Sequence, residues 1–561
     1  HRDLHSFPTR RSSDLCLGLL LTVLAGCTGT TTTTTAKPTT TGTGATTAAP
    51  TTTEPDKLAN INLDSQFPVV HDEITLKLMG ARSATKGEWE DLKFFKVLQE
   101  RANIKLEFVT VPSENWEERK NLAFTSDNLP DIFFGVTLSA NDETTYGPQG
   151  YLLPLEDLIE NYSVNFKALL EKQPTVKQDI TTPDGHIYAL PYVNDMPRDL
   201  TEKIWFNKAW TDELGINVPT TTEELYNVSM AFKDGDPNKN GNPADEIPLS
   251  LKDLNNPRDL RLLMSYWGLT VDPATYIANK NDTLVFAPNQ PVFKDFLLYM
   301  NKLFAEGLLD IESFTQTNEQ LKAKGKQDVQ VLGAFVNAGA FLVVPEDQNE
   351  DYIALAPLKT PEGTQEWIKL NPVRPGAFAI TKNADEEKAV AALRMVDWVY
   401  SSEGALVLMR GLENEDYEYT NAEKTQCKLI IPEGFKNFEE YRAKMLTPNS
   451  GSRTPGIGAF TLPVVWNPLN DYINQQVDAN LVPYWKQPLP LLYFSADDQK
   501  KIASIGADVN AYVVQSMARF ITNDLSIETG WDGYLNDLNR MGINDYMSIY
   551  QAAYDVWKSN S

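Results

Sequence analysis

Apolar and polar residues alternate with two different periods in the first part of the chain. Residues 74–78 and 104–108 carry an apolar side chain at every second position, which predicts two strands. Residues 89–102 carry apolar side chains at helical spacing, which predicts an amphipathic helix between these strands. A second helix is expected after Ser113, a suitable N-cap, and the apolar run 131–135 is typical of a buried strand.

This β-α-β-α-β order predicts a parallel, doubly wound α/β sheet. Ligands of such sheets bind beyond the carboxyl ends of the strands. The residues from Gly80 to Ser83 and those just after Gly135 are therefore expected to face a cleft. Many α/β enzymes share the pattern, so the fold alone does not determine the function.

The N-terminal region differs in composition from the rest of the chain. Residues 1–15 are similar to a translated sequencing adapter joined to a truncated gene, and residues 17–24 form an apolar run with the length of a signal-peptide core. Residues 28–55 are almost all Thr, Ala, Gly and Pro, which cannot bury enough surface to fold. We expect an adapter-like artefact plus signal peptide over residues 1–27 and a disordered tether, or sugar-bearing stalk, over residues 28–65.

The apolar run ends in Leu24-Ala25-Gly26-Cys27, which resembles the lipobox of bacterial lipoproteins. By this resemblance, the thiol of Cys27 receives the lipid and becomes the start of the mature chain. The alternative is an ordinary buried cysteine in an apolar stretch. If the resemblance holds, the chain is anchored by lipid at the outer face of the cell membrane.

Composition argues against several classes of function. The 561 residues carry a formal net charge of −26, whereas nucleic-acid binding depends on clustered Lys and Arg. The chain has 3 cysteines and 4 histidines, and it lacks the common motifs for a serine elbow, a phosphate loop, a zinc protease or a CxxC pair. We expect that it is not an enzyme. A glycoside hydrolase stays open, because 76 acidic residues supply many carboxylate pairs. Cys427 is expected to be a free structural thiol.

Several segments resemble the family 1 extracellular solute-binding proteins, in the same order along the chain. They are Phe94–Lys96, Ile104–Leu106, Asn121–Ile132, Gly150–Leu155, Pro183–Pro191, Phe206–Lys208, Val218–Thr221, Asp245–Leu249, Met541–Ile543 and Ile549–Tyr554. The similarity extends from about residue 70 to the end, and it is greatest to the large lipoproteins that include alginate- and oligosaccharide-binding receptors. It implies a periplasmic-binding-protein-like fold, in which two doubly wound α/β lobes are joined by crossing hinge strands and close on the substrate.

The resemblance also implies where each lobe lies in the sequence. Lobe 1 is expected over residues 66–203 and 374–440, and lobe 2 over residues 204–373 and 441–561. The first crossing is placed near Ile204–Asn207 and the second near Val373–Gly376. The third is placed between Glu433 and Gly458.

Carbohydrate sites combine flat aromatic side chains with amides, carboxylates and arginines that bind hydroxyl groups. The candidate contacts near crossings or in irregular segments are Tyr192, Asp195, Trp205, Trp267, Arg374, Trp466 and Trp485. For each tryptophan the alternative is a core position, and for Arg374 it is a salt bridge at the hinge.

These observations together predict a receptor lipoprotein that captures an extracellular oligosaccharide for the permease subunits of an ABC importer, as a monomer. A sensor or adhesion lipoprotein of the same fold remains an alternative. So does the glycoside hydrolase.

A calcium loop is predicted in the second lobe. Asp236, Asn238 and Asn240 alternate like the first ligands of an EF-hand loop, and Gly241 stands where such loops turn sharply. The remaining ligands are expected to be Asn242, Asp245 and Glu246. Ile247 occupies the position of the usual EF-hand glutamate, which departs from that pattern. The loop resembles that of the alginate-binding relatives, with one more residue before Asp245. The alternative is a polar turn without metal.

Overall fold

The computed structural model describes residues 57–559, apart from 136–137, 243, 253–257, 361–362, 449–453, 459–463 and 466. Contacts divide the chain into two units, His1–Pro55 and Asp56–Ser561, and every element below belongs to the second. The expected signal peptide, Cys27 and most of the tether lie outside the described residues. Among the residues that are described, no helix combines the length and the apolar character needed to cross a membrane.

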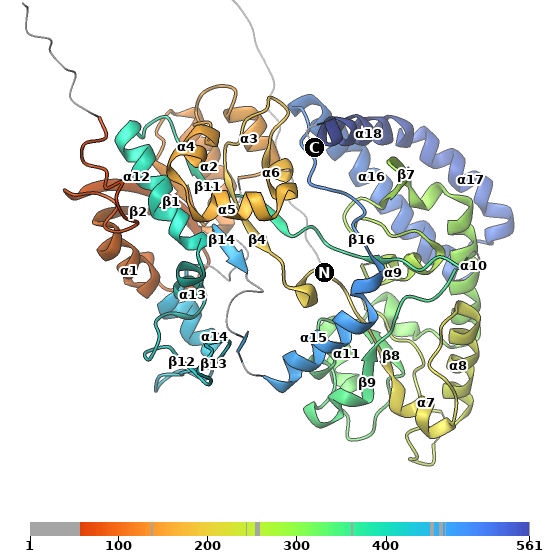
Figure 1. The fold of residues 1–561 in the computed structure, drawn as a ribbon. Coiled ribbons are helices and arrows are strands. Elements are labelled where there is room, and N and C mark those ends of the chain that lie inside the picture. The colour runs from red at the N-terminus through yellow and green to blue at the C-terminus, as the bar shows by residue number, and fades with distance from the viewer. Residues whose placement is uncertain are drawn as a thin grey trace, which may run out of the picture. The chain divides into compact units, whose positions relative to one another are not determined.

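Six strands form the first sheet, in the order β14-β4-β11-β3-β1-β2 (Figure 1). They are β1 (Ile74–Arg82), β2 (Ile104–Pro112), β3 (Ile132–Phe134), β4 (Leu190–Asn194), β11 (Val373–Ile380) and β14 (Gly456–Gly458). β1 pairs in parallel with both β2 and β3, which confirms the predicted parallel arrangement of these three strands. β11 runs antiparallel to its neighbours β3 and β4.

Helices cover both faces of this sheet. They are α1 (Lys93–Ala102), α2 (Trp116–Thr125), α3 (Ala140–Tyr146), α4 (Glu156–Tyr162), α5 (Asn165–Lys172), α6 (Pro174–Ile180), α12 (Glu386–Asp397), α13 (Ser402–Arg410) and α14 (Phe438–Tyr441). One core cluster joins Leu76 and Leu78 of β1 to the buried stripes of α1 and α12. A second cluster lies under α2, on the opposite face of the sheet, because the side chains of β1 alternate between the two faces.

Two local expectations about the first helices are wrong. The helix expected from Trp89 begins at Lys93, because Trp89–Asp91 form a 3₁₀ turn and Leu92 is extended. Ser113 does not cap α2: it starts a further 3₁₀ turn, and Asn115 occupies the N-cap position without a side-chain hydrogen bond. Hydrophobic periodicity continues through such turns, so it locates the helix and not its first residue.

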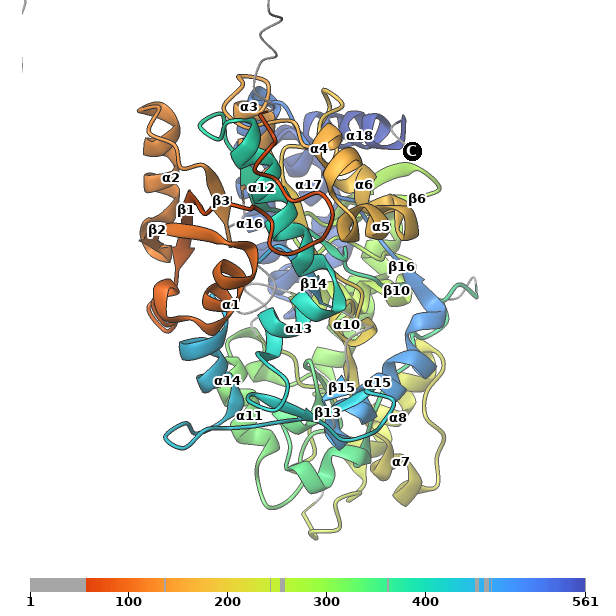
Figure 2. The same cartoon turned by 60° about the vertical axis from the view of Figure 1, so that its left-hand side comes forward.

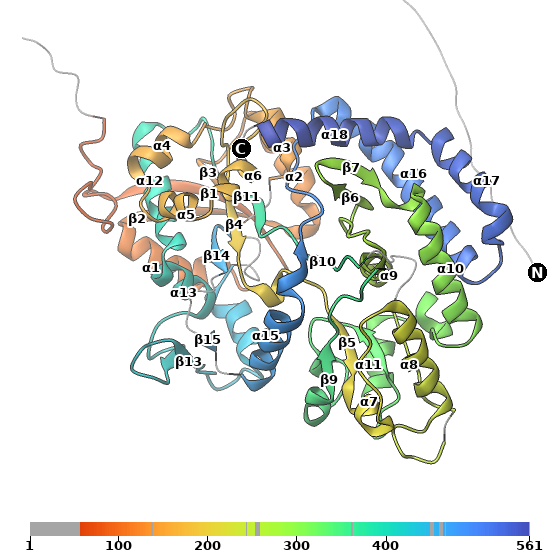
Figure 3. The same ribbon diagram turned by 45° about the vertical axis from the view of Figure 1, so that its right-hand side comes forward.

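A second sheet has the order β8-β5-β9, and both outer strands run antiparallel to β5. Its strands are β5 (Ile204–Asn207), β8 (Ala334–Val336) and β9 (Tyr352–Ala354), and the hairpin β6 (Ile277–Lys280) and β7 (Thr283–Phe286) lies in the same part of the chain. The helices here are α7 (Lys208–Leu214), α8 (Thr222–Asp234), α9 (Arg258–Leu263), α10 (Pro291–Ala305), α11 (Asn318–Gly325), α15 (Pro468–Asn480), α16 (Ala496–Ile521), α17 (Ile527–Arg540) and α18 (Ile543–Ser559). In Figure 3, α7, α8 and α11 gather around β5 and β9. A large core cluster unites this sheet with these helices.

Two small sheets accompany the main ones. β10 (Trp367–Ile368) pairs in parallel with β16 (Trp485–Lys486), so the segment that leads from the second sheet to β11 lies beside the segment between α15 and α16 (Figure 2). The other small sheet has the order β12-β13-β15, with β12 (Tyr417–Tyr419), β13 (Gln426–Leu429) and β15 (Val464–Val465). The described part of the chain contains one free cysteine, the buried Cys427 of β13, as expected.

Two of the expected boundaries differ from the structure. Ile61 falls in the tether expected over residues 28–65, yet it is 4% exposed, belongs to the first core cluster and bridges Val70. The ordered part therefore begins before residue 66. Gly456–Gly458 were expected in the second lobe, but they form β14 of the first sheet, so the third crossing lies after Gly458. A glycine-rich strand of three residues has no hydrophobic period that could reveal it.

Candidate functional site

The carboxyl ends of the parallel strands bring several candidate residues to one edge of the first sheet. Tyr192 of β4 pairs with Arg374 of β11 on one side and with Gly456 of β14 on the other. Tyr192 is buried, whereas Arg374 is exposed. A Cβ atom on Gly458 would lie 2.0 Å from the Tyr192 hydroxyl oxygen, so this strand approaches the tyrosine too closely for any larger residue.

Charges surround Tyr192 at this edge. Burial, followed by the nearby carboxylates of Asp199 and Asp195, raises the pKa of Tyr192 to about 12, while Arg442 and Arg374 act in the opposite direction. Tyr192 is therefore neutral at physiological pH and offers a hydroxyl group to a polar ligand.

Asp195 lies beside the same edge, whereas Trp485 lies between α15 and α16 and packs against the second sheet's core cluster. The half-buried Asp195 directly follows β4, and its backbone N–H donates to the Gly458 carbonyl at 3.4 Å. Trp485 of β16 is half-buried, and its indole Nε1 is a buried donor without a partner in the described part of the chain. The Lys369 ammonium lies 5.5 Å from the centre of its ring.

Trp205 and Trp267 do not lie where a ligand could stack on them. Trp205 is fully buried in β5, and its Nε1 donates to the Asn337 carbonyl at 3.0 Å. Trp267 is 9% exposed and packs on Phe296 and Tyr299. Both are core residues of the second sheet's cluster, which was the alternative interpretation. Trp466 lies outside the described residues.

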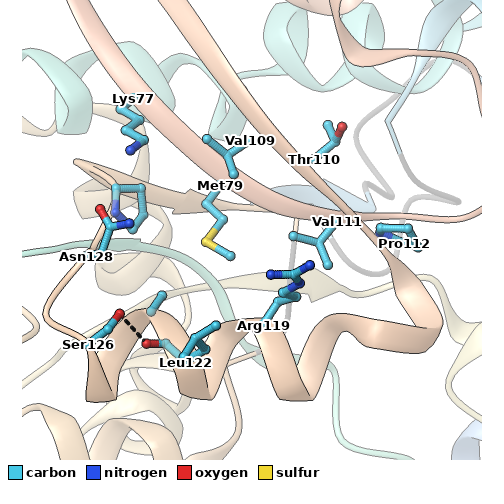
Figure 4. A pocket seen from close by; sticks show the side chains of 12 residues that line it. Lys77, Met79, Val109, Thr110, Val111, Pro112, Arg119, Leu122, Ser126 and Asn128 are labelled. Carbon is cyan, nitrogen blue, oxygen red and sulfur yellow. Dashed lines mark hydrogen bonds between the residues drawn. The ribbon is translucent and has the colours of Figure 1, made fainter.

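A pocket of about 360 Å³ opens between α2 and the edge strand β2 (Figure 4). Met79, Val109 and Val111 supply an apolar floor, and Arg119 of α2 stands beside it. None of the candidate ligand contacts lines this pocket. It therefore does not extend the site at Tyr192 and Arg374.

One buried carboxylate joins the first sheet's helices to the connecting segments. Asp179 of α6 is 3% exposed, and it accepts hydrogen bonds from the Asn371 amide at 3.1 Å and from Nε1 of Trp557, in α18, at 3.0 Å. Burial, only partly offset by these bonds and by the N–H of Leu491, raises the pKa of Asp179 to about 6. Sequence reasoning missed this residue, because its partners come from three distant segments.

Stability is expected to fall as the pH rises from about 4 to 6, owing to Asp179. An aspartate in the unfolded chain titrates near pH 4, so in this window the folded chain holds a proton that the unfolded chain has lost. Asp179→Asn should remove the part of this slope that Asp179 contributes, which urea unfolding at stepped pH would measure. Asp497→Asn, at a side chain 87% exposed, is the control and should keep the parental slope. An unchanged slope in Asp179→Asn would contradict the assignment.

The expected calcium loop folds back on its own side chains. The Asp236 carboxylate accepts from the backbone N–H groups of Asn240 and Gly241, at 3.1 and 2.9 Å. The amide of Asn240 donates to Asp245 Oδ2 at 2.6 Å, and that of Asn238 lies 3.4 Å from Oδ1 of the same carboxylate. Asn242 is exposed, and its N–H donates to the Asn240 side chain at 2.7 Å.

Glu246 is the unusual member of this loop. It is 8% exposed, and neither carboxylate oxygen has a hydrogen-bond partner among the described residues. Burial, and the charges of Asp245 and Asp236, raise the pKa of Glu246, while the backbone N–H groups of Glu246 and Asp245 act in the opposite direction. A buried carboxylate without donors is costly and fits a cation. Nevertheless, within the described ranges no three acidic, histidine or cysteine side chains stand close enough to hold an ion as the loop is arranged here.

Comparisons with known proteins agree with this architecture. Residues 83–406 match the family described as "Bacterial extracellular solute-binding protein". The chain belongs to this family. Such proteins have the periplasmic-binding-protein fold, which the solved structures below also show.

Two curated members of the family are similar in sequence. The fructooligosaccharide ABC transporter substrate-binding protein FusA of Streptococcus pneumoniae is 26% identical over 512 residues, which are 88% of this chain and 92% of FusA. The polygalacturonan/rhamnogalacturonan-binding protein YtcQ of Bacillus subtilis is 26% identical over 307 residues, 52% of this chain and 57% of YtcQ.

Solved structures of the family match over most of the chain. FusA in complex with kestose has a TM-score of 0.67, at 26% identity, and the match covers 87% of this chain and 100% of the FusA chain in that structure. A FusA EF-hand mutant in complex with fructo-nystose gives 0.66. A solute-binding protein from Bifidobacterium longum subsp. infantis gives 0.75 at 20% identity, over 86% of this chain and 98% of its own, and supports the fold.

Proposed function

We propose that this solute-binding protein captures an oligosaccharide outside the cell and delivers it to an ABC importer. The observation that carries the proposal is the similarity to FusA, a fructooligosaccharide-binding protein, over 88% of this chain and 92% of FusA. The edge formed by Tyr192, Asp195 and Arg374 agrees with it, because hydroxyl, carboxylate and guanidinium groups bind sugar hydroxyls. The ligand is bound between two lobes, residues 57–203 with 374–458 and residues 204–373 with 467–559, and is released without reaction.

Binding without hydrolysis is the expected result. The purified chain is incubated with a panel of neutral and acidic oligosaccharides, and binding is measured by titration calorimetry before the sugars are separated by chromatography. At least one sugar should bind with a micromolar or lower Kd and emerge unchanged. Cleavage products would favour the glycoside hydrolase, and an absence of binding across the panel would overturn the proposal.

Lipid attachment at Cys27 places the receptor at the outer face of the membrane. This part of the proposal rests on the lipobox-like residues Leu24–Cys27. We expect a Cys27→Ser variant to appear in the soluble fraction or to keep its signal peptide, because one thiol is the only attachment point. Fractionation of cells that express each form measures this. Normal processing and membrane recovery of the variant would contradict it.

Calcium is the proposed structural ion of the loop from Asp236 to Glu246. Asp236, Asp245 and Glu246 supply carboxylate oxygens, and Asn238 and Asn240 supply amide oxygens once their end groups rotate away from Asp245. Asn242 adds its main-chain carbonyl. The Glu246 carboxylate, which has no hydrogen-bond partner among the described residues, supports this assignment. So does the solved structure of a FusA EF-hand mutant, which implies an EF-hand in that relative. The ion would stabilise the fold and take no part in ligand chemistry.

A further inference from the structure

The loop that follows β1 is held against the turn that follows α14. Gly87 donates its N–H to the Ala443 carbonyl at 3.1 Å, and a Cβ atom on Gly87 would lie 2.0 Å from the carbonyl oxygen of Lys444. Figure 2 shows α14 beside the segment that connects β1 with α1. Arg82 fixes the loop from within, since its guanidinium donates to the Lys86 carbonyl at 3.2 Å and pairs with Glu88 at 2.9 Å.

This contact brings Lys86 close to Arg442, and both retain unused donors. Lys86 is half-buried, and its ammonium has no hydrogen-bond or ion-pair partner in the part of the chain that the structure describes. The Arg442 guanidinium binds Glu439 through Nε and Nη2, but its buried Nη1 has no partner among the described residues. Burial, and next the charge of Arg442, lower the pKa of Lys86, while the Glu439 carboxylate acts in the opposite direction. The charged form of Lys86 is therefore destabilised, and a neighbouring anion would stabilise it.

The pair lies at the same edge of the sheet as Tyr192 and Arg374. Lys86 follows the carboxyl end of β1, and Arg442 acts electrostatically on the Tyr192 hydroxyl together with Arg374. Arg374 is exposed and also lacks a hydrogen-bond or ion-pair partner among the described residues. The nearby carboxylates are those of Glu88, Glu439, Asp195 and Asp199; the first two are engaged with Arg82 and Arg442.

We propose that Lys86, Arg442 and Arg374 form an anion subsite at this edge, and that the oligosaccharide ligand carries a carboxylate there. This inference rests on the proposed function and narrows its substrate class to acidic sugars. A neutral hydroxyl could occupy one donor, but an anion would also offset the charge of Lys86, which has no carboxylate partner of its own in the described part of the chain. The net charge of −26 on the chain repels an anion only at long range, where physiological salt screens it.

The test compares sugars that differ only in charge. Short oligomers of galacturonate, and of other uronic acids, are titrated into the purified full chain by calorimetry, alongside their fully methyl-esterified forms and kestose. At least one acid should bind ten or more times more tightly than its methyl ester. Equal affinity for acid and ester, or binding of neutral sugars alone, would overturn the subsite and leave the proposed receptor function intact. If no sugar of the panel binds, both proposals fail.

The Lys86→Gln variant tests whether the preference for the acid over its methyl ester depends on the subsite. Lys86 has no partner to lose, so this variant should keep the parental melting temperature. Arg442→Gln, by contrast, replaces a buried guanidinium that pairs with Glu439, and it risks the fold. Lys86→Gln should weaken acid binding about tenfold and leave ester binding unchanged. Lys500→Gln, at a side chain 80% exposed, is the matched control and should bind like the parent. If Lys86→Gln binds the acid as tightly as the parent, Lys86 has no part in the site and the subsite as proposed is wrong.

Discussion

Trp205→Ala is expected to lower the free energy of unfolding by about 3–5 kcal/mol, because it empties a fully enclosed position in the central strand of the second sheet. The backbone of Trp205 pairs with Phe335 and Ala354 on its two sides. Its ring stacks on Tyr472 with centroids 6.4 Å apart. The alanine variant also leaves the Asn337 carbonyl without its indole donor. Urea unfolding followed by circular dichroism measures the loss.

Two further variants separate a core role from a ligand role. Trp205→Phe keeps most of the ring volume and loses the hydrogen bond, so it should cost less than the alanine variant. Trp485→Ala acts on a half-buried ring and should cost still less than Trp205→Ala. If Trp205→Ala unfolds at the parental urea concentration but binds its sugar more weakly, the ring is a ligand platform and the core assignment is wrong.

Trp205 was expected to contact the ligand, but the residues around it carry a sequence signal for a core position. Ile204, Trp205 and Phe206 form an unbroken apolar run, which is typical of a strand buried on both faces, and Asn207 after it is also buried. The resemblance placed the first crossing in this segment, and β5 is the central strand of the second sheet. It could not tell whether the tryptophan faces the ligand or the core, because a run without alternation carries no information about faces.

The parallel strands and helices of the first sheet were predictable, because each depends on a period within about ten residues. The anion subsite was not predictable in this way. Lys86 and Arg442 come from opposite ends of the first lobe's sequence, and only the packing of the loop after β1 on the turn after α14 brings them together. The expectation that residues near Gly80–Ser83 face a cleft came close, since Lys86 lies three residues further on. Arg374 was named as a candidate because it lies at an expected crossing.

The calcium loop was predictable from spacing, because its candidate ligands lie within eleven residues of one another. The burial of Glu246 was not, since Ile247 occupies the position where the familiar glutamate is expected. In the structure Glu246 is buried, and its side-chain oxygens have no hydrogen-bond partner among the described residues. Replacing Glu246 is therefore expected to affect the free energy of unfolding differently in the presence and in the absence of calcium.

Calcium at a thousand times its Kd is expected to raise the free energy of unfolding by about 4 kcal/mol, because it binds the folded loop and not the unfolded chain. Glu246→Gln should lose most of this gain. In chelator the same variant should be at least as stable as the parent, since it replaces a buried, partnerless carboxylate by a neutral group. Thermal melts of both forms, in calcium and in chelator, measure the crossover. Asp234→Asn, at an exposed residue just before the loop, should follow the parent in both conditions. The loop would be a polar turn without metal if the parent melts at the same temperature in calcium and in chelator and elemental analysis finds no calcium. The same would follow if Glu246→Gln is destabilised equally in both conditions.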